Sequence, residues 1–248
     1  MFMTILETSR EQKQMRMKGG LYHKVQIDLT YNSNHIEGGR LTHEQTRLIF
    51  ETNTIGVDKD TSVNIDDIIE TSNHFRCIDY IIDKADKPLT ENVIKSLHGL
   101  LKTGTSDGRK EWFNVGEYKK MPNEVGGVET TLPENVGMEM SALLEGYNEK
   151  VALPLSEDAL LDTIIDFHHR FECIHPFQDG NGRVGRLIAL KECLHHDIVP
   201  FIIEDSKKAF YYRGLAEWEN EKGYLTDTCL DGQDSFKRLL AVFGLIAG

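Results

Sequence analysis

Cysteine is scarce in this sequence, and no two cysteines form a CxxC pair. Cys77, Cys173, Cys193 and Cys229 are too few and too scattered for a disulfide framework or a zinc-ribbon site. The simplest interpretation is a protein of a reducing compartment, and we expect a cytoplasmic location.

A signal peptide and a long apolar run are also missing. The first twenty residues are interrupted by charged side chains at five positions between Glu7 and Arg16, so they lack the continuous apolar region of a secretory signal. The most apolar stretch, Leu239 to Ala247, has about half the length that a transmembrane helix requires. We therefore expect no membrane partner.

Positive charge is in short supply overall. The 248 residues include 28 Lys and Arg against 40 Asp and Glu, which gives a formal net charge of −12. An acidic field repels phosphate-rich partners, so a nucleic-acid partner is not expected, and a phosphate ligand would need a local pocket that overrides the field. The length suits one domain or a closely joined pair.

The apolar residues that are present recur mostly at three- and four-residue steps, which predicts a largely helical fold. Thr42 and Thr90 are expected N-caps. A segment from Gly116 to Gly137 differs, because it is rich in Gly, Pro and β-branched residues and predicts a small hairpin. The periodic segments are 42–50, 68–82, 90–101, 160–174 and 184–194.

The segment HPFQDGNGRVGR, residues 175–186, lies between two of these predicted helices. Pro176 disfavours helical geometry for the residue before it, so the first helix should end at His175. The second helix should begin near Gly182, and its unpaired N–H groups and dipole favour an anion there. Arg183 and Arg186 are three residues apart and lie on the same side of the first turn.

A carboxylate and an imidazole stand beside this positive turn. Together with the two arginines, Asp179 and His175 favour a polyphosphate, a divalent cation and a general base. Two histidines in the preceding helix, His168 and His169, point about 100° apart and cannot chelate one metal together, so we expect structural roles for them.

This turn also has features in common with other nucleotide- and calcium-binding motifs. Gly180-x-Gly182-x-x-Gly185 matches the dinucleotide fingerprint, but that fingerprint requires a preceding strand, and a helix is predicted instead. No GxxxxGK[ST] occurs, and an EF-hand would need an oxygen ligand where Arg183 stands. The alternative left open is an ordinary glycine-rich turn with solvated arginines.

The segment matches HPFx(D/E)GNGRxxR at every defined position and resembles the Fic domain of the Fic/DOC family. The resemblance covers roughly residues 65–220. It implies an all-α fold, a Fic-type helical bundle with a small β-hairpin flap. We expect an N-terminal helical extension at 1–64, a Fic core at 65–205 and C-terminal helices packed on the core at 206–248.

The resemblance also implies an activity, transfer of AMP from ATP to a hydroxyl of a target protein. His175 would be the general base and Asp179 the Mg²⁺ ligand, while Arg183 would neutralise the pyrophosphate and Arg186 would hold the γ-phosphate. The expected nucleotide-binding residues are Gly180, Asn181, Gly182, Arg183, Arg186, Tyr211 and Tyr212. We expect Trp112 and Trp218 to be core residues.

Ser33 to Gly38 matches the inhibitory motif of the same family, (S/T)xxxE(G/N), and lies N-terminal to the core. The spacing of Ser33 and Glu37 puts both on one helix face, which Gly38 then ends. The resemblance implies that Glu37 pairs with Arg186 and restrains the enzyme. In some Fic proteins this glutamate also supports removal of AMP, by orienting a water.

The hairpin at 116–137 is the expected docking place of the protein substrate, by pairing with an extended segment. Lys119 and Lys120 are expected to be solvated. Self-modification is expected, and a homodimer is left open. Two alternative functions remain, a Doc-like phosphotransferase and a non-catalytic nucleotide-binding module.

Overall fold

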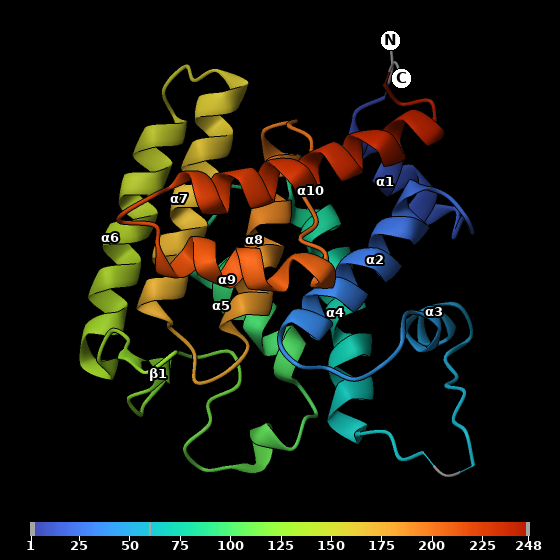
Figure 1. Ribbon diagram of the computed structural model, residues 1–248, viewed down its shortest axis with the longest axis horizontal. Helices are drawn as coiled ribbons and strands as arrows, with labels where there is room; N and C mark the ends of the chain where they lie inside the picture. The colour runs from blue at the N-terminus through green and yellow to red at the C-terminus, as the bar shows by residue number, and fades with distance from the viewer. Residues whose placement is uncertain (1–2, 60, 247–248) are drawn as a thin grey trace.

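The computed structural model describes residues 3–59 and 61–246 as a bundle of helices (Figure 1). The described residues leave out 1–2, 60 and 247–248. These positions belong to the expected N-terminal extension at 1–64 and C-terminal region at 206–248, and Ala247 is also the end of the apolar C-terminal stretch. The all-α prediction is confirmed.

The helices of the described chain share a pattern of one buried and one solvated face. They are α1 (Ile5–Gln14), α2 (Leu21–Ile36), α3 (His43–Thr52), α4 (Ile65–Lys84), α5 (Glu91–Lys102), α6 (Pro133–Val151), α7 (Glu157–Ile174), α8 (Asn181–His195), α9 (Lys208–Ala216) and α10 (Gly223–Val242), with 3₁₀ turns η1 (Asp107–Arg109) and η2 (Asp205–Lys207).

The exception to that pattern is α8, the helix at the centre of the bundle. Thirteen of its fifteen residues are buried, and it contacts α2, α4, α5 and α7. A helix enclosed on all sides must satisfy any charge it carries with neighbouring side chains. The first turn of α8 carries Arg183 and Arg186, so their partners come from the surrounding helices.

Local sequence signals set the helix ends. Thr42 and Thr90 cap α3 and α5 through their side chains, as predicted. Helix α7 ends at Ile174, and His175 follows in the left-handed region with φ of 49°. The prediction that Pro176 stops this helix at His175 is therefore confirmed.

The hairpin is smaller than the sequence predicted. Only Glu124–Val125 (β1) and Val128–Glu129 (β2) pair, antiparallel, across Gly126 and Gly127. The expected segment 116–137 ended too late, because Pro133 begins α6. Proline suits the first turn of a helix, where its missing N–H costs nothing.

The prediction that both tryptophans are core residues was half right. The side chain of Trp112 is exposed, so that prediction was wrong, whereas Trp218 is buried as expected.

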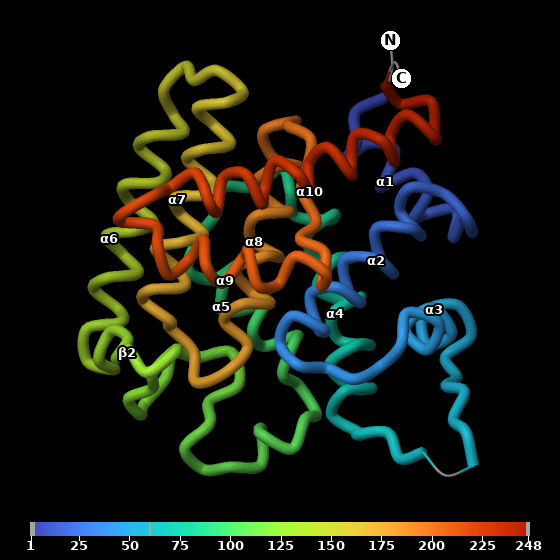
Figure 2. Tube along the Cα trace, in the orientation of Figure 1, coloured from blue at the N-terminus to red at the C-terminus, as the bar shows by residue number. Residues whose placement is uncertain are grey.

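The N-terminal region and the core share one hydrophobic cluster, in which Leu21, Leu29 and Ile36 of α2 join residues of α4, α5 and α8. Figure 2 follows the chain from α2, which lies against α4, to α3 at the edge of the bundle. This packing brings the C-terminal end of α2 to the start of α8.

Nowhere in residues 3–59 and 61–246 is a helix both long and apolar enough to span a bilayer.

Candidate active site

The loop between α7 and α8 is fixed by its own side chains. Asn181 accepts a hydrogen bond from the Phe177 backbone N–H and donates one to the Phe177 carbonyl, both at 2.8 Å. The Phe177 ring is fully buried and stacks on His98 with centroids 4.0 Å apart. Gly180, at φ of 84°, precedes α8 and offers no side-chain cap. The first N–H groups of α8 are therefore available to an anion.

His175 is oriented by two amides. Its Nδ1 lies 3.0 Å from Nδ2 of Asn123 and 3.1 Å from Nδ2 of Asn181. The oxygens of both amides are already engaged, by the Lys119 ammonium and by the Phe177 N–H, so the amides donate to Nδ1. Burial, reinforced by the Lys119 charge, lowers the pKa of His175 to about 4. The ring is neutral near pH 7, with its one proton on Nε2 and Nδ1 as its basic nitrogen.

Arg186 is buried, and its partners come from the end of α2. Its Nη2 donates to Oε1 of Glu37 at 2.7 Å and to the Ser33 carbonyl at 2.9 Å, while its Nε donates to Oγ of Ser33 at 3.0 Å. A Cβ placed on Gly182 would lie 2.2 Å from Oε1 of Glu37. The carboxylate thus lies directly over the first turn of α8, where an anion would bind.

The segment from Ser33 to Gly38 differs from expectation in one detail. Helix α2 ends at Ile36, so Glu37 is its C-cap and not a helical residue, and Gly38 turns the chain with φ of 91°. A hydrogen bond from Oη of Tyr212 to the Ile36 carbonyl, at 2.9 Å, holds this end. Ser33 and Glu37 nonetheless both contact Arg186, a contact that the resemblance implied for Glu37.

Arg183 and Asp179 belong to a second, larger charge cluster. Arg183 donates to Oδ2 of Asp179 at 3.2 Å and pairs with Glu70, while Lys102 donates to Oδ2 of Asp179 at 2.6 Å. Although burial alone would raise it, the pKa of Asp179 falls to about 2 because of the Arg183 and Lys102 charges. Asp179 is therefore an anion throughout the neutral range.

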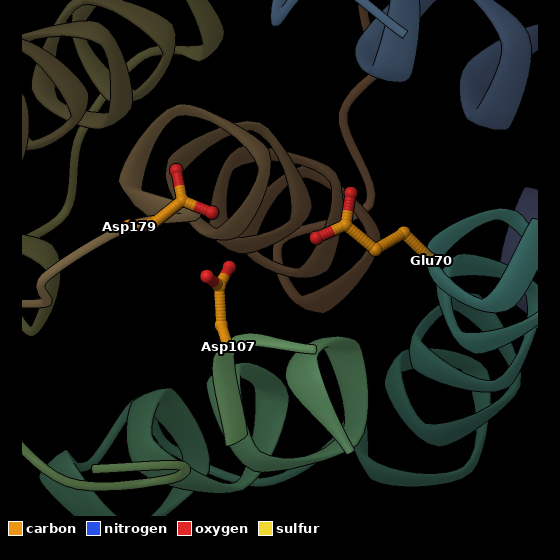
Figure 3. A group of neighbouring side chains, drawn as sticks. All are labelled: Glu70, Asp107 and Asp179. Carbon is orange, nitrogen blue, oxygen red and sulfur yellow. The ribbon is translucent and has the colours of Figure 1, made fainter. Parts of the chain in front are cut away.

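Three carboxylates from separate elements converge on one point beside α8, those of Glu70, Asp107 and Asp179 (Figure 3). One oxygen of each lies within 4.8 Å of the others. Mg²⁺ commonly takes one or two carboxylates together with phosphate oxygens and water. The half-exposed Asp179, whose Oδ1 is engaged by neither Lys102 nor Arg183, fits that role.

A cavity of about 230 Å³ opens between the end of α2, the start of α4 and the motif loop. Glu37, Lys102, Asp107, Asp179 and Arg183 contribute to its walls. Arg183 and the carboxylates of Glu37, Glu70 and Asp179 thus border one cavity.

Sequence reasoning missed part of this site. Glu70 and Asp107 carry no motif, and no pattern in the chain links them to Asp179. The expectation for Lys119 was wrong, because this lysine is buried, with its Nζ 2.6 Å from both Oδ1 of Asn123 and Oγ1 of Thr130. Its backbone N–H also donates to the Pro176 carbonyl at 2.8 Å, which fastens the base of the hairpin to the motif loop.

The aromatic and histidine residues around Arg186 are structural in this state. Oη of the buried Tyr211 lies 2.9 Å from Nε2 of His168 and 3.4 Å from Nη1 of Arg186. His168 and His169 are buried, as expected for structural residues. Nucleotide binding by Tyr211 and Tyr212 stays a prediction.

A helical bundle whose central helix starts at a histidine-led, glycine-rich anion loop defines a class of protein. Residues 88–193 match the Fic/DOC family, and they form a Fic/DOC family domain. This agrees with the resemblance found in the sequence.

The curated relatives include "Protein adenylyltransferase Fic" of Nematostella vectensis, 25% identical over 189 residues, and the protein of the same name in Drosophila melanogaster, 28% identical over 189 residues. The aligned part is 75% of this chain in both cases, but 41% of the first relative and 36% of the second. The chain therefore spans less than half the length of these relatives.

Solved structures share the fold. A Fic domain containing signaling protein from Bacteroides thetaiotaomicron is 25% identical, with a TM-score of 0.71 over 96% of this chain and 91% of that one. Fic-1 of C. elegans, 18% identical, gives a TM-score of 0.73 over 96% of this chain and 72% of that one.

Proposed function

We propose that this protein is a protein adenylyltransferase, which transfers AMP from ATP to a hydroxyl side chain of a target protein. The observation that carries the proposal is the start of α8, where free N–H groups, two buried arginines and a neutral imidazole meet in one loop. The curated relatives bear the name of this activity.

The proposed chemistry is an in-line displacement at the α-phosphorus. The target hydroxyl takes the place of an amide donor at Nδ1 of His175, which accepts its proton as the new O–P bond forms and the bond to pyrophosphate breaks. Arg183 and the first N–H groups of α8 bind the departing charge, and Arg186 binds the γ-phosphate. Asp179 would hold Mg²⁺, which supplies further charge neutralisation when it is bound with the nucleotide. The residues Gly180, Asn181 and Gly182 keep the loop close to the phosphates.

We propose that Glu37 restrains this reaction. Its carboxylate takes the guanidinium of Arg186 that the γ-phosphate needs, so a nucleotide must displace it to bind productively. Coupling of this kind typically amounts to about 1–3 kcal/mol, or 5–150-fold. Glu37 would also orient a water for removal of AMP. Equal loss of AMP from a modified target with the wild type and with Glu37→Ala would contradict that second role.

The hairpin is the proposed docking place of the target. Val125 and Val128 are exposed on its two short strands, and main-chain pairing there would bind extended segments with little demand on their sequence. Self-modification, a homodimer and a cytoplasmic location stay proposals of the same kind.

The deciding experiment uses ATP labelled on the α- or the γ-phosphate with Glu37→Gly protein. Protein-bound α-label is the expected result, and His175→Ala in the same background should abolish it. Protein-bound γ-label would indicate a Doc-like phosphotransferase. Nucleotide binding without either label on protein would indicate a non-catalytic module.

A further inference from the structure

Lys102 is the last residue of α5, and its ammonium lies at the point where the three carboxylates of Figure 3 converge. Its Nζ is 2.5 Å from Oε1 of Glu70, 2.8 Å from Oδ2 of Asp107 and 2.6 Å from Oδ2 of Asp179. The side chain is 1% exposed. Lys102 donates hydrogen bonds to Glu70 and Asp179 and forms an ion pair with Asp107.

The same three carboxylates have the chemistry of a divalent-cation site. They supply hard oxygen ligands from α4, η1 and the loop between α7 and α8, with one oxygen of each within 4.8 Å of the others. With Lys102 present, two buried cations, Lys102 and Arg183, face the three carboxylates, and the exposed Lys110 pairs with Asp107 from the solvent side. Without Lys102, Arg183 would be the one buried cation among them, and a free divalent ion would find a more anionic pocket.

Lys102 also decides which oxygen of Asp179 is available. The hydrogen bonds from Lys102 and Arg183 both fall on Oδ2. This leaves Oδ1 as the oxygen that neither cation engages. A carboxylate held in this way is oriented before any ligand arrives.

We propose that Lys102 is a resident cation that holds Asp179 in position and keeps divalent ions from binding to Glu70, Asp107 and Asp179 without nucleotide. Metal then enters this site only together with the phosphates of a nucleotide. The entry of metal together with nucleotide rests on the proposed function, whereas the exclusion of free metal by Lys102 does not.

The test measures Mn²⁺ binding to the nucleotide-free protein by electron paramagnetic resonance. Lys102→Met should create a saturable site that binds Mn²⁺ at least about tenfold more tightly than the wild type, because affinity in such sites follows ligand charge. Adding Glu70→Gln should remove the gain. The matched control is Lys110→Met, which removes an exposed cation that pairs with Asp107 at 2.6 Å but with neither Glu70 nor Asp179, and its gain in Mn²⁺ affinity should be much smaller than that of Lys102→Met.

Folded Lys102→Met protein with no gain over Lys110→Met would overturn the proposal. If Lys102→Met does not fold, the wild type still decides: tight stoichiometric Mn²⁺ binding without nucleotide would refute it, and Mn²⁺ uptake only with a non-hydrolysable ATP analogue would support it. A gain in Lys102→Met with no Mn²⁺ uptake by the wild type plus analogue would refute the link to nucleotide, while the exclusion by Lys102 stands.

Discussion

Arg183 and Arg186 lie three residues apart in the first turn of α8, and both are buried, yet different side chains hold them. Arg186 faces one carboxylate, that of Glu37, which is 28% exposed and follows the last residue of a helix. Arg183 faces Glu70 and Asp179, which are shared with a buried lysine.

A single carboxylate at the end of a helix can be displaced by a stronger anion, whereas a network of three carboxylates and two cations is costly to dismantle. This difference indicates that the pair of Arg186 and Glu37 suits regulation, whereas the network around Arg183 suits fixed positioning. Variants of the two clusters can test this difference, and a further variant extends it to the imidazole of His175.

The largest expected effect is on stability. Lys102→Met removes the buried cation that three carboxylates share, so the free energy of unfolding should fall by about 3–5 kcal/mol. Glu37→Gln keeps a hydrogen-bond acceptor near Arg186 and should cost about 1 kcal/mol. Urea denaturation followed by circular dichroism measures both. Equal losses would show that the two clusters are held alike.

The next effect is on activity. Glu37→Gly should raise AMP transfer by roughly 5–150-fold, because it frees Arg186 for the γ-phosphate. Glu70→Gln is the matched change on the other arginine and should bring no gain, because Arg183 is positioned by that pair and not blocked by it. Incorporation of α-labelled ATP checks both. A gain with Glu70→Gln would remove the functional distinction between the two sides.

A smaller change should appear in the pH dependence. Lys119→Met removes a positive charge that disfavours protonation of His175, so the pKa of His175 should rise from about 4 by roughly half to one unit. A general base must be unprotonated, so the acid limb of kcat/KM should move to higher pH, and activity near pH 5 should fall relative to the plateau.

The exposed neighbour Lys120 supplies the control for this measurement, since Lys120→Met should leave the limb in place. Profiles are compared after scaling to their plateaus, because Lys119 also fixes Asn123 and its loss should lower the plateau itself. An unmoved limb in Lys119→Met would show that the ring does not sense this charge.

How far the sequence could predict the site differs between the two clusters. The pairing of Glu37 with Arg186 was expected from the family resemblance, because each residue occupies a defined position in a motif of that family. The cluster around Arg183 was not, since Glu70, Lys102 and Asp107 come from α4, α5 and η1 and meet only through helix packing. Lys119 was misjudged for a related reason: its hydrogen-bond partners exist only when the hairpin folds back on the motif loop.

The helices of the fold show the same contrast between local signals in the sequence and contacts made only by packing. Helices with clear periodicity and caps, such as α3 and α5, were predicted close to their observed bounds. Helix α6 was missed because the glycine- and proline-rich pattern before it was extended past Pro133. Proline marks a helix start as readily as a turn, and only the packing of Val136 and Met140 into the core distinguishes the two.

The smallest predicted effect concerns what holds Glu37 in place. Tyr212→Phe removes the hydrogen bond to the Ile36 carbonyl, which is worth about 0.5–1.5 kcal/mol, and leaves the ring. If that bond helps to keep the end of α2 over α8, the variant should show a severalfold rise in basal AMP transfer, less than that of Glu37→Gly, and the rise should vanish in a Glu37→Gly background. A rise that persists there would mean that Tyr212 acts on the nucleotide site directly, and that the restraint on Arg186 depends on the carboxylate alone.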